Sequence, residues 1–260
     1  MPDRPNLLAL DFDGVLCDGL LEYFQTAWRT YLEVWSPPES TPPDDLPPRF
    51  YRTRPVIETG WEMPLLIRAL VLGWAESQIL SDWHSISRQL LEQEHLSPEV
   101  LGPRLDQIRD EWIATDLPGW LALHGFYPGV CDRLRVILEQ DMIELRIITT
   151  KEERFVRSLL GQQGIILGPG MIFGKGHKQP KHQTLRDLMT LSDPSPVIWF
   201  VEDRMKTLLS VQAQTDLQQV KLFLADWGYN TPIERRLVAE YPPICLLSLS
   251  QFSRDFEAWS

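Results

Sequence analysis

From about residue 145 onward, short apolar runs alternate with amphipathic stretches, and this alternation most constrains the fold. Apolar runs of four or five residues indicate buried strands, and apolar residues three or four apart indicate helices. The predicted strands are 7–10, 145–148, 197–201, 220–224 and 244–247, and the predicted helices are 152–163, 181–191, 204–215 and 231–241. Such alternation is typical of β-α-β units, so we expect an α/β, Rossmann-like, doubly wound core of five or six parallel strands.

A long insertion follows the first strand. About 130 residues separate it from residue 145, far more than a βα connection needs. Apolar residues recur there at helical spacing over residues 20–35, 65–72, 79–90 and 101–112, with a proline-dense loop over residues 36–48. We therefore expect an α/β core domain of residues 1–17 and 125–260 and an inserted, all-helical domain of residues 18–124.

Composition excludes several classes of partner. A formal charge of -11 repels polyanions, so nucleic acid and anionic membranes are not expected as partners, and an anionic ligand needs a local cluster of basic groups. Cys17, Cys131 and Cys245 are odd in number and widely spaced, which argues against a disulfide framework or zinc site and predicts a cytoplasmic protein. The first apolar run is too short for a signal peptide or a membrane span.

Two carboxylates close the first strand. Asp11 and Asp13 lie on the same side of the strand because they are two residues apart, and two like charges this close need a cation or a proton between them. Gly14 permits a tight turn and a close approach of the backbone to a ligand. A polar strand end with an ordinary turn is an equally common explanation. A calcium EF-hand, with Glu22 twelve positions in, is disfavoured because the loop glycine is misplaced.

Polar residues also follow two later strands. Thr149 and Thr150 stand between a strand and a helix, where hydroxyls and free amides can bind phosphate, although Thr149 also suits an N-cap. Glu202 and Asp203 precede another helix, where acids are often caps. Because parallel strands end at one edge of a sheet, these acids and Asp11 could instead converge on Mg²⁺.

A basic cluster lies within residues 174–182, which hold three lysines, whereas the first 150 residues hold none. A solvated loop is the usual explanation. Lys181, however, begins a predicted helix directly after Pro180, where a cation is unfavourable unless an anion compensates it. Lys178 is the alternative, and the helix-initiating position of Pro180 favours Lys181.

Taken in order, these features resemble the four motifs of the haloacid dehalogenase superfamily. The resemblance covers residues 7–14 and about 126–230, including Tyr-Pro-Gly-Val at 127–130 and Asp-Trp-Gly-Tyr-Asn at 226–230, which are similar to the phosphoglycolate phosphatase branch. The helical insertion occupies the position of that branch's cap domain, without a close sequence match.

The resemblance implies a mechanism in which Asp11 attacks phosphorus to form an aspartyl-phosphate, and Asp13 protonates the leaving group and then activates water. It also implies that Lys181 supplies a fixed positive charge and that Thr149 holds the phosphoryl oxygens. Gly14 and Thr150 would contribute to substrate binding.

The resemblance further implies one Mg²⁺ between the Asp11 carboxylate, the Asp13 carbonyl and Asp203. Many members carry a second acid three or four residues beyond the last motif. Here Glu202 precedes Asp203, and it is the candidate for a further metal ligand.

The implied activity is phosphatase action on a small phosphorylated metabolite. Dehalogenases of this superfamily do not need Asp13, and phosphonoacetaldehyde hydrolases need a cap lysine that residues 18–124 lack. A sugar phosphomutase is the weaker alternative, and a non-catalytic binding or regulatory protein of the same fold is another.

Arg54 and Glu58 lie where related caps present a specificity loop. We expect them to reach the substrate's leaving group, although a surface patch is the commoner role for such residues.

Overall fold

The computed structural model describes residues 4–140, 142–190 and 195–259, and the chain divides into two compact units. The first, called here the α/β unit, comprises Met1–Asp18 and Gly125–Ser260. The second, the helical unit, comprises Gly19–His124. The first boundary lies one residue beyond the expected one.

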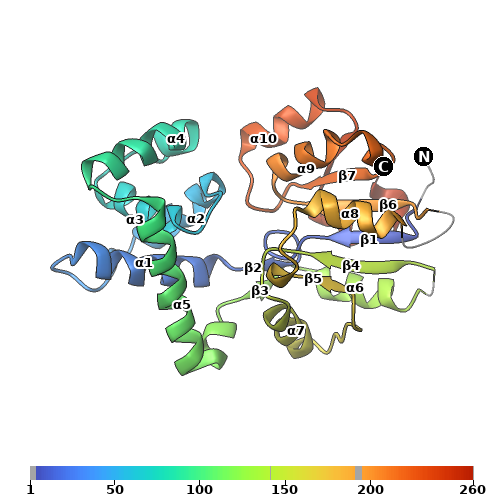
Figure 1. Cartoon of the computed structure of the whole chain (residues 1–260), viewed down its shortest axis with the longest axis horizontal. Coiled ribbons are helices and arrows are strands. Elements are labelled where there is room, and N and C mark those ends of the chain that lie inside the picture. Colours follow the sequence, from blue (N-terminus) through green and yellow to red (C-terminus); the bar gives the residue numbers. More distant parts are fainter. Residues whose placement is uncertain (1–3, 141, 191–194, 260) are drawn as a thin grey trace. The chain divides into compact units, whose positions relative to one another are not determined.

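A six-stranded sheet forms the centre of the α/β unit (Figure 1). Its strands are β1 (Leu7–Leu10), β4 (Glu144–Ile148), β5 (Ile172–Phe173), β6 (Ile198–Glu202), β7 (Lys221–Ala225) and β8 (Ile244–Leu247), in the order β5-β4-β1-β6-β7-β8. All neighbouring pairs are parallel, which confirms the predicted fold class. The two-residue strand β5 was not among the predicted strands.

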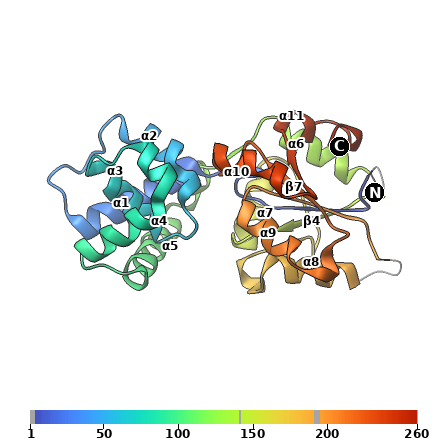
Figure 2. The same ribbon diagram turned by 90° about the horizontal axis from the view of Figure 1, so that it is seen from above.

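Helices cover both faces of this sheet. They are α6 (Val130–Leu138), α7 (Glu153–Gln162), α8 (Lys181–Thr190), α9 (Met205–Gln212), α10 (Pro232–Leu237) and α11 (Leu249–Phe252). Figure 2 shows α6 and α11 on one face and α8 and α9 on the other. The predicted helices 204–215 and 231–241 were too long, because α9 and α10 end early and 3-10 turns follow them at Thr215–Leu217 and Val238–Glu240. The last residue of predicted helix 181–191, Leu191, lies outside the described residues.

The two sheet faces carry different cores because side chains alternate along each strand. Ala9, Phe200 and Leu222 pack in one cluster with residues of α8 and α9. On the other face, the Trp199 and Phe223 rings contact the ring of Trp259, with centroids 5.9 and 5.5 Å apart. The C-terminal segment that carries Trp259 therefore covers part of one face of the sheet.

The helical unit consists of α1 (Leu20–Trp35), α2 (Leu46–Thr53), a 3-10 turn (Arg54–Val56), α3 (Glu62–Val71), α4 (Glu76–Gln93) and α5 (Pro98–Leu121). The expected loop over residues 36–48 is shorter than predicted, because Pro47 and Pro48 occupy the first turn of α2, where a helix needs no amide donor. Among the described residues, none of the helices combines the length and apolarity that a bilayer crossing requires.

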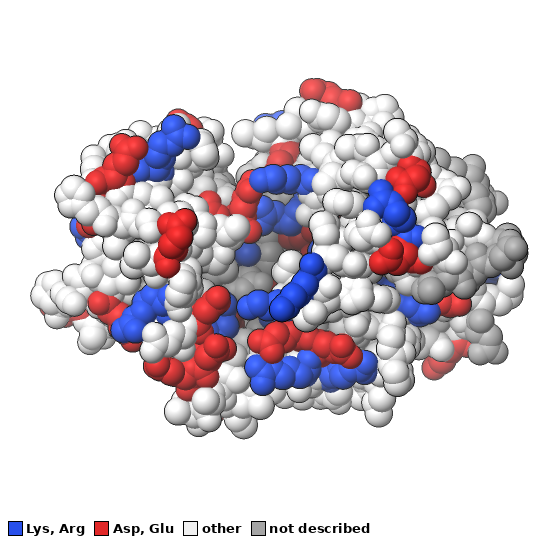
Figure 3. Space-filling view, viewed as in Figure 1, with Lys and Arg blue, Asp and Glu red and all other residues white. Residues whose placement is uncertain are grey.

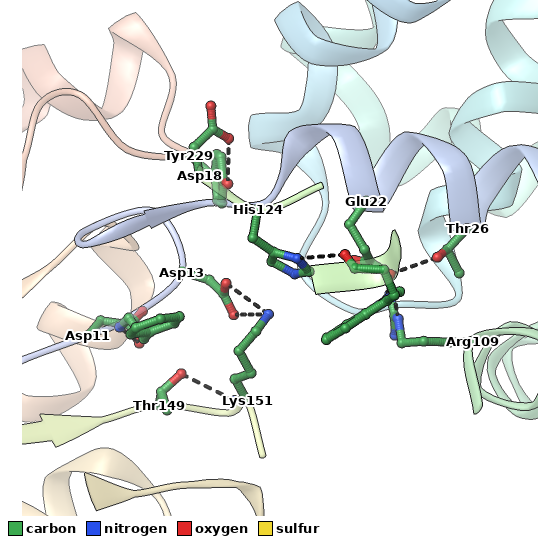
Figure 4. Close-up of polar contacts among 12 residues, drawn as sticks. Asp11, Asp13, Asp18, Glu22, Thr26, Arg109, His124, Thr149, Lys151 and Tyr229 are labelled. Atoms are coloured by element: carbon green, nitrogen blue, oxygen red, sulfur yellow. Dashed lines mark hydrogen bonds and ion pairs between the residues drawn. The ribbon is translucent and has the colours of Figure 1, made fainter. Parts of the chain in front are cut away.

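A buried carboxylate links the ends of the helical unit's sequence. The Glu22 side chain is 1% exposed, and its Oε1 accepts hydrogen bonds from Thr26 Oγ1 at 2.7 Å, Arg109 Nε at 2.9 Å and Trp120 Nε1 at 3.1 Å (Figure 4). Because Glu22 lies on α1 whereas Arg109 and Trp120 lie on α5, this cluster joins the first and last helices of the unit.

Two short antiparallel strands, β2 (Cys17–Asp18) and β3 (Gly125–Phe126), stand where the helical unit is inserted into the α/β unit. Cys17 pairs with Phe126, and Asp18 pairs with Gly125. The Tyr229 hydroxyl, from the loop after β7, donates to Asp18 Oδ1 at 3.0 Å. The chain thus leaves and re-enters the α/β unit at one paired position.

Candidate active site

The register of the parallel strands β1, β4 and β6 places the predicted site residues at one edge of the sheet. Leu10 of β1 pairs with Ile147 of β4 on one side and Val201 of β6 on the other. The residues that follow these three positions therefore emerge at nearly the same level. In this way parallel pairing alone brings the loops that carry Asp11, Thr149 and Asp203 together.

Lys181 lies between two buried carboxylates. Its Nζ is 2.8 Å from Asp11 Oδ1 and 2.7 Å from Glu202 Oε2. Burial opposes its charge, but Asp11 and Glu202 outweigh that effect and raise the pKa of Lys181 above its ordinary value. Lys178, the alternative, is exposed and ends the 3-10 turn Lys175–His177 in a left-handed conformation. Of the two lysines, Lys181 is the one that contacts Asp11.

Burial also changes the acidity of the carboxylates. Asp11 is 7% exposed; its burial, together with the charge of Glu202, raises the pKa of Asp11 to about 7 despite Lys181. Burial and the charge of Asp11 raise the pKa of Asp203 to about 6. Burial likewise raises the pKa of Glu202. Burial and the nearness of like charges thus disfavour the ionised forms of these carboxyl groups.

The loop after β7 holds Asp203 in place. The Tyr229 amide donates to Asp203 Oδ2 at 2.7 Å, and Asn230 Nδ2 donates to the backbone carbonyls of Asp203, at 2.9 Å, and Ala225, at 2.7 Å. Gly14 has φ +86°, and a Cβ there would overlap the Asp203 carboxylate. Only glycine therefore lets the turn after Asp13 approach Asp203 this closely.

Asp13 has a basic partner that the sequence analysis missed. Lys151 Nζ lies 3.1 Å from Asp13 Oδ1 and 3.2 Å from Oδ2, and the Lys151 side chain is 8% exposed (Figure 4). One sequence feature could have pointed to it: Lys151 is the first lysine of the chain and follows directly on Thr149 and Thr150.

The two threonines after β4 have different surroundings. Thr149 is buried, and its Oγ1 accepts a hydrogen bond from the Lys151 amide at 3.1 Å, so the hydroxyl also caps the following turn. Thr150 is exposed. Asp11, Asp13, Thr149 and Lys151 all come from loops at the same edge of the sheet (Figure 4).

The donor set suits a divalent cation. Asp11, Glu202 and Asp203 each offer a carboxylate oxygen, and these three atoms lie within 4.8 Å of one another. With Asp13 the site holds four carboxylates against two lysines, so two negative charges are uncompensated when all six groups are ionised. Carboxylate oxygens are ligands that Mg²⁺ prefers, and a divalent cation would compensate the two remaining negative charges.

Glu202 has donors on both of its oxygens. Oε1 accepts a hydrogen bond from the Arg204 amide at 3.1 Å, and Oε2 accepts one from Lys181 at 2.7 Å. The side chain is fully buried. This arrangement suits holding Lys181 beside Asp11.

Arg54 and Glu58 belong to the helical unit. The Arg54 side chain is buried, donates from Nη1 to the Ile57 carbonyl at 3.1 Å, and lies over the Tyr23 ring at 4.9 Å. Glu58 is exposed, and its amide donates to Glu62 Oε2 at 2.7 Å. A role for either residue in recognising a leaving group stays a prediction.

The surface carries charges of both signs. On the face shown in Figure 3, basic and acidic side chains are interspersed. Several form ion pairs, such as Arg52 with Glu76 and Arg186 with Asp216. Each such pair neutralises one charge of either sign and leaves the formal net charge of -11 unchanged.

Comparison with solved structures identifies the fold of the chain. No family model matches the sequence, and no curated protein matches it. Among solved structures, a predicted phosphoglycolate phosphatase from Haemophilus somnus 129PT has a TM-score of 0.58 and 16% identity, over 99% of this chain and 96% of that one. A protein assigned as a haloacid dehalogenase-like hydrolase, from Bacteroides fragilis, has a TM-score of 0.56 and 17% identity, over 95% and 99%. A predicted phosphatase from Clostridium acetobutylicum has a TM-score of 0.53 and 11% identity, over 96% of each chain. The chain has the fold of the haloacid dehalogenase-like hydrolases.

Proposed function

We propose that the protein is a Mg²⁺-dependent phosphatase that hydrolyses a small phosphorylated metabolite through an aspartyl-phosphate on Asp11. The observation that carries the proposal is the buried Asp11 carboxylate at the end of β1, held 2.8 Å from Lys181 and grouped with Asp203. A nucleophile, a fixed cation and a second oxygen ligand are the parts that phosphoryl transfer uses. The descriptions of structurally similar proteins as phosphatases support the same activity.

The reaction has two displacements. In the first, an Asp11 oxygen attacks phosphorus, the bond to the leaving-group oxygen breaks, and that oxygen takes a proton from the Asp13 carboxyl. In the second, a water oxygen attacks the same phosphorus, its proton passes to Asp13, and the bond to Asp11 breaks to release phosphate. Lys181 balances the Asp11 charge, while the Thr149 hydroxyl and the backbone at Gly14 and Thr150 hold the phosphoryl oxygens.

Mg²⁺ would be held by the carboxylates of Asp11 and Asp203 and by the carbonyl of Asp13. When bound, it supplies positive charge that compensates the phosphoryl oxygens. Because both Glu202 oxygens already accept hydrogen bonds, Glu202 would serve chiefly to hold Lys181.

We also propose a class of substrate and a cellular compartment. A formal charge of -11 disfavours a polyanionic partner and favours a small anion, which Lys181 and bound Mg²⁺ would attract. The three cysteines are free, which suits a reducing compartment such as the cytoplasm.

The test is hydrolysis of an aryl phosphate with and without Mg²⁺, by the wild type and by Asp11→Asn. We expect Mg²⁺-dependent release of phosphate by the wild type, its loss in Asp11→Asn, and a phosphorylated Asp11 by mass spectrometry after a rapid acid quench. Asp216→Asn, which changes an exposed acid paired with Arg186, is the matched control and should keep wild-type activity.

Three outcomes would contradict the proposal. Undiminished activity in Asp11→Asn would exclude the aspartyl-phosphate route, and no turnover of any member of a panel of phosphorylated metabolites would favour a binding or regulatory protein. Formation of an isomeric sugar phosphate without free phosphate would instead identify a phosphomutase.

A further inference from the structure

We propose that Lys151 is a positioning residue that orients the Asp13 carboxyl for proton transfer to the leaving group. The inference rests on the proposed phosphatase function. It assigns each lysine of the site to a different aspartate: Lys181 to the nucleophile and Lys151 to the proton donor.

The backbone of Lys151 is held on two sides. Its amide donates to Thr149 Oγ1 at 3.1 Å, and its carbonyl accepts a hydrogen bond from the Lys175 amide at 2.9 Å. A Cβ at Gly174 would lie 2.7 Å from the Lys151 carbonyl oxygen, so this glycine allows the segment after β5 to pack against it. The base of the Lys151 side chain is therefore fixed by the loops that follow β4 and β5.

The end of the side chain is fixed by Asp13. Nζ lies almost equally far from the two carboxylate oxygens, at 3.1 and 3.2 Å. A cation shared between both oxygens restrains the direction in which the Asp13 side chain points, because moving the carboxyl group away from Lys151 lengthens both contacts at once. Because the side chains of Lys151 and Asp13 are 8% and 18% exposed, water competes little for this contact.

Orientation matters for one chemical event in particular. As the bond between phosphorus and the leaving-group oxygen breaks, the Asp13 proton must already lie within hydrogen-bond reach of that oxygen. An alkoxide leaving group depends strongly on this proton, whereas 4-nitrophenolate leaves readily without it. A residue that positions Asp13 should therefore affect alkyl phosphates far more than aryl phosphates.

Lys151 could alternatively contact the phosphoryl group directly. In that case, its removal would weaken the transition state of every substrate equally, whatever the leaving group. The dependence on leaving group separates the two roles.

The experiment measures kcat/KM for an alkyl phosphate and for 4-nitrophenyl phosphate in the wild type, Lys151→Met and Lys151→Arg. This parameter reports steps only up to departure of the leaving group. We expect the ratio of alkyl to aryl kcat/KM to fall roughly 10- to 100-fold in Lys151→Met, which is part of the roughly 100- to 10,000-fold that general acid catalysis contributes. Lys151→Arg should recover part of the ratio, because its two parallel donors can also engage both oxygens.

A double-mutant cycle with Asp13→Asn tests whether Lys151 acts through Asp13. Lys151→Met should cause little further loss on the alkyl phosphate when Asp13→Asn is already present, because interacting residues are not additive. Equal losses on both substrates, or fully additive losses, would overturn the proposal. Lys151→Gln is measured beside Lys151→Met, with circular dichroism for both, so that the result does not depend on one variant folding.

Failure of this inference is distinguishable from failure of the proposed function. The same assay includes Asp11→Asn, which reports on the nucleophile. A wild type that is active and an Asp11→Asn that is inactive, together with an unchanged substrate ratio in Lys151→Met, would reject the role of Lys151 alone.

Discussion

The backbone amide of Tyr229 donates to Asp203 Oδ2 over 2.7 Å, so a residue 26 positions along the chain orients a candidate metal ligand. The hydroxyl of the same tyrosine reaches Asp18, at the edge of the α/β unit. Tyr229 thus connects the acidic cluster and the strand through which the chain leaves this unit. Its neighbour Asn230 supports the same loop through two buried backbone carbonyls.

Asn230→Ala should lower the free energy of unfolding by about 1–3 kcal/mol, because the carbonyls of Asp203 and Ala225 lose a buried donor. The displaced loop should also weaken Mg²⁺ binding. Urea unfolding in chelator and calorimetric titration with Mg²⁺ measure the two effects. Tyr229→Phe is the control: it removes the hydroxyl contacts to Asp18 and Tyr127 but keeps the amide contact to Asp203, so Mg²⁺ affinity should stay at the wild-type value. An equal loss of affinity in both variants would contradict this account.

Gly14→Ala should disrupt the acidic cluster. The alanine would have to adopt φ +86°, and its Cβ would overlap the Asp203 carboxylate. Gly170→Ala is a matched control, since Gly170 has φ +74° but no atom lies within 4 Å of the position that a Cβ would take there. Both variants should be destabilised by the backbone conformation, by about 1 kcal/mol. Only Gly14→Ala should also lose Mg²⁺ binding, measured by calorimetry. Normal Mg²⁺ affinity in Gly14→Ala would show that Asp203 is not held by this close approach.

Much of the α/β fold could be predicted because its strands are buried on both faces. The run at 7–10 coincides with β1, a fully buried strand that is apolar throughout. The run at 244–247 coincides with β8, which is apolar although it lies at the edge of the sheet and Leu246 is exposed. The strand Ile172–Phe173 could not be predicted, because two residues have no measurable periodicity. The helix Leu46–Thr53 was missed for a different reason: its prolines break helices in most positions but are tolerated in the first turn.

Only those site residues that directly follow strands could be placed from the sequence. Asp11 and Asp203 follow strands that parallel pairing brings to one edge, so their proximity follows from topology. The contact of Lys151 with Asp13 depends on the direction of a long side chain, which no sequence pattern specifies. The same limit applies to Lys178 and Lys181: Lys178 adopts a left-handed conformation after the turn Lys175–His177, whereas Lys181 begins α8.

Arg109→Met should destabilise the helical unit strongly. Glu22 is 1% exposed, and removing Arg109 would take away the cation that lies 2.9 Å from its buried charge, at a cost of about 3–5 kcal/mol. The double variant with Glu22→Gln should regain most of that stability, because the buried charge is then absent. Urea unfolding measures both. Arg52→Met, which breaks an exposed pair with Glu76, should cause no measurable change. A small effect of Arg109→Met would mean that water or another group compensates Glu22.

Stability without metal should fall as the pH rises from about 4 to about 7. In the unfolded chain Asp11 and Asp203 lose their protons near their ordinary pKa of 3.8, whereas burial raises their pKa in the folded protein to about 7 and about 6. The folded state therefore binds more protons in this window, and the free energy of unfolding must decrease with pH.

Urea unfolding in chelator at closely spaced pH values measures this slope, and saturating Mg²⁺ should flatten it because the cation compensates both carboxylates. Asp11→Asn should reduce the slope between about pH 6 and 7, where Asp11 has the higher pKa of the two aspartates. Asp11→Asn should also reduce the slope of stability against pH below about pH 6, because the Asp11 charge helps to raise the pKa of Asp203. Asp216→Asn, at an exposed position, should keep the whole slope. A wild-type stability that rises between pH 4 and 7 in chelator would show that the two carboxylates are ionised in the folded protein without metal.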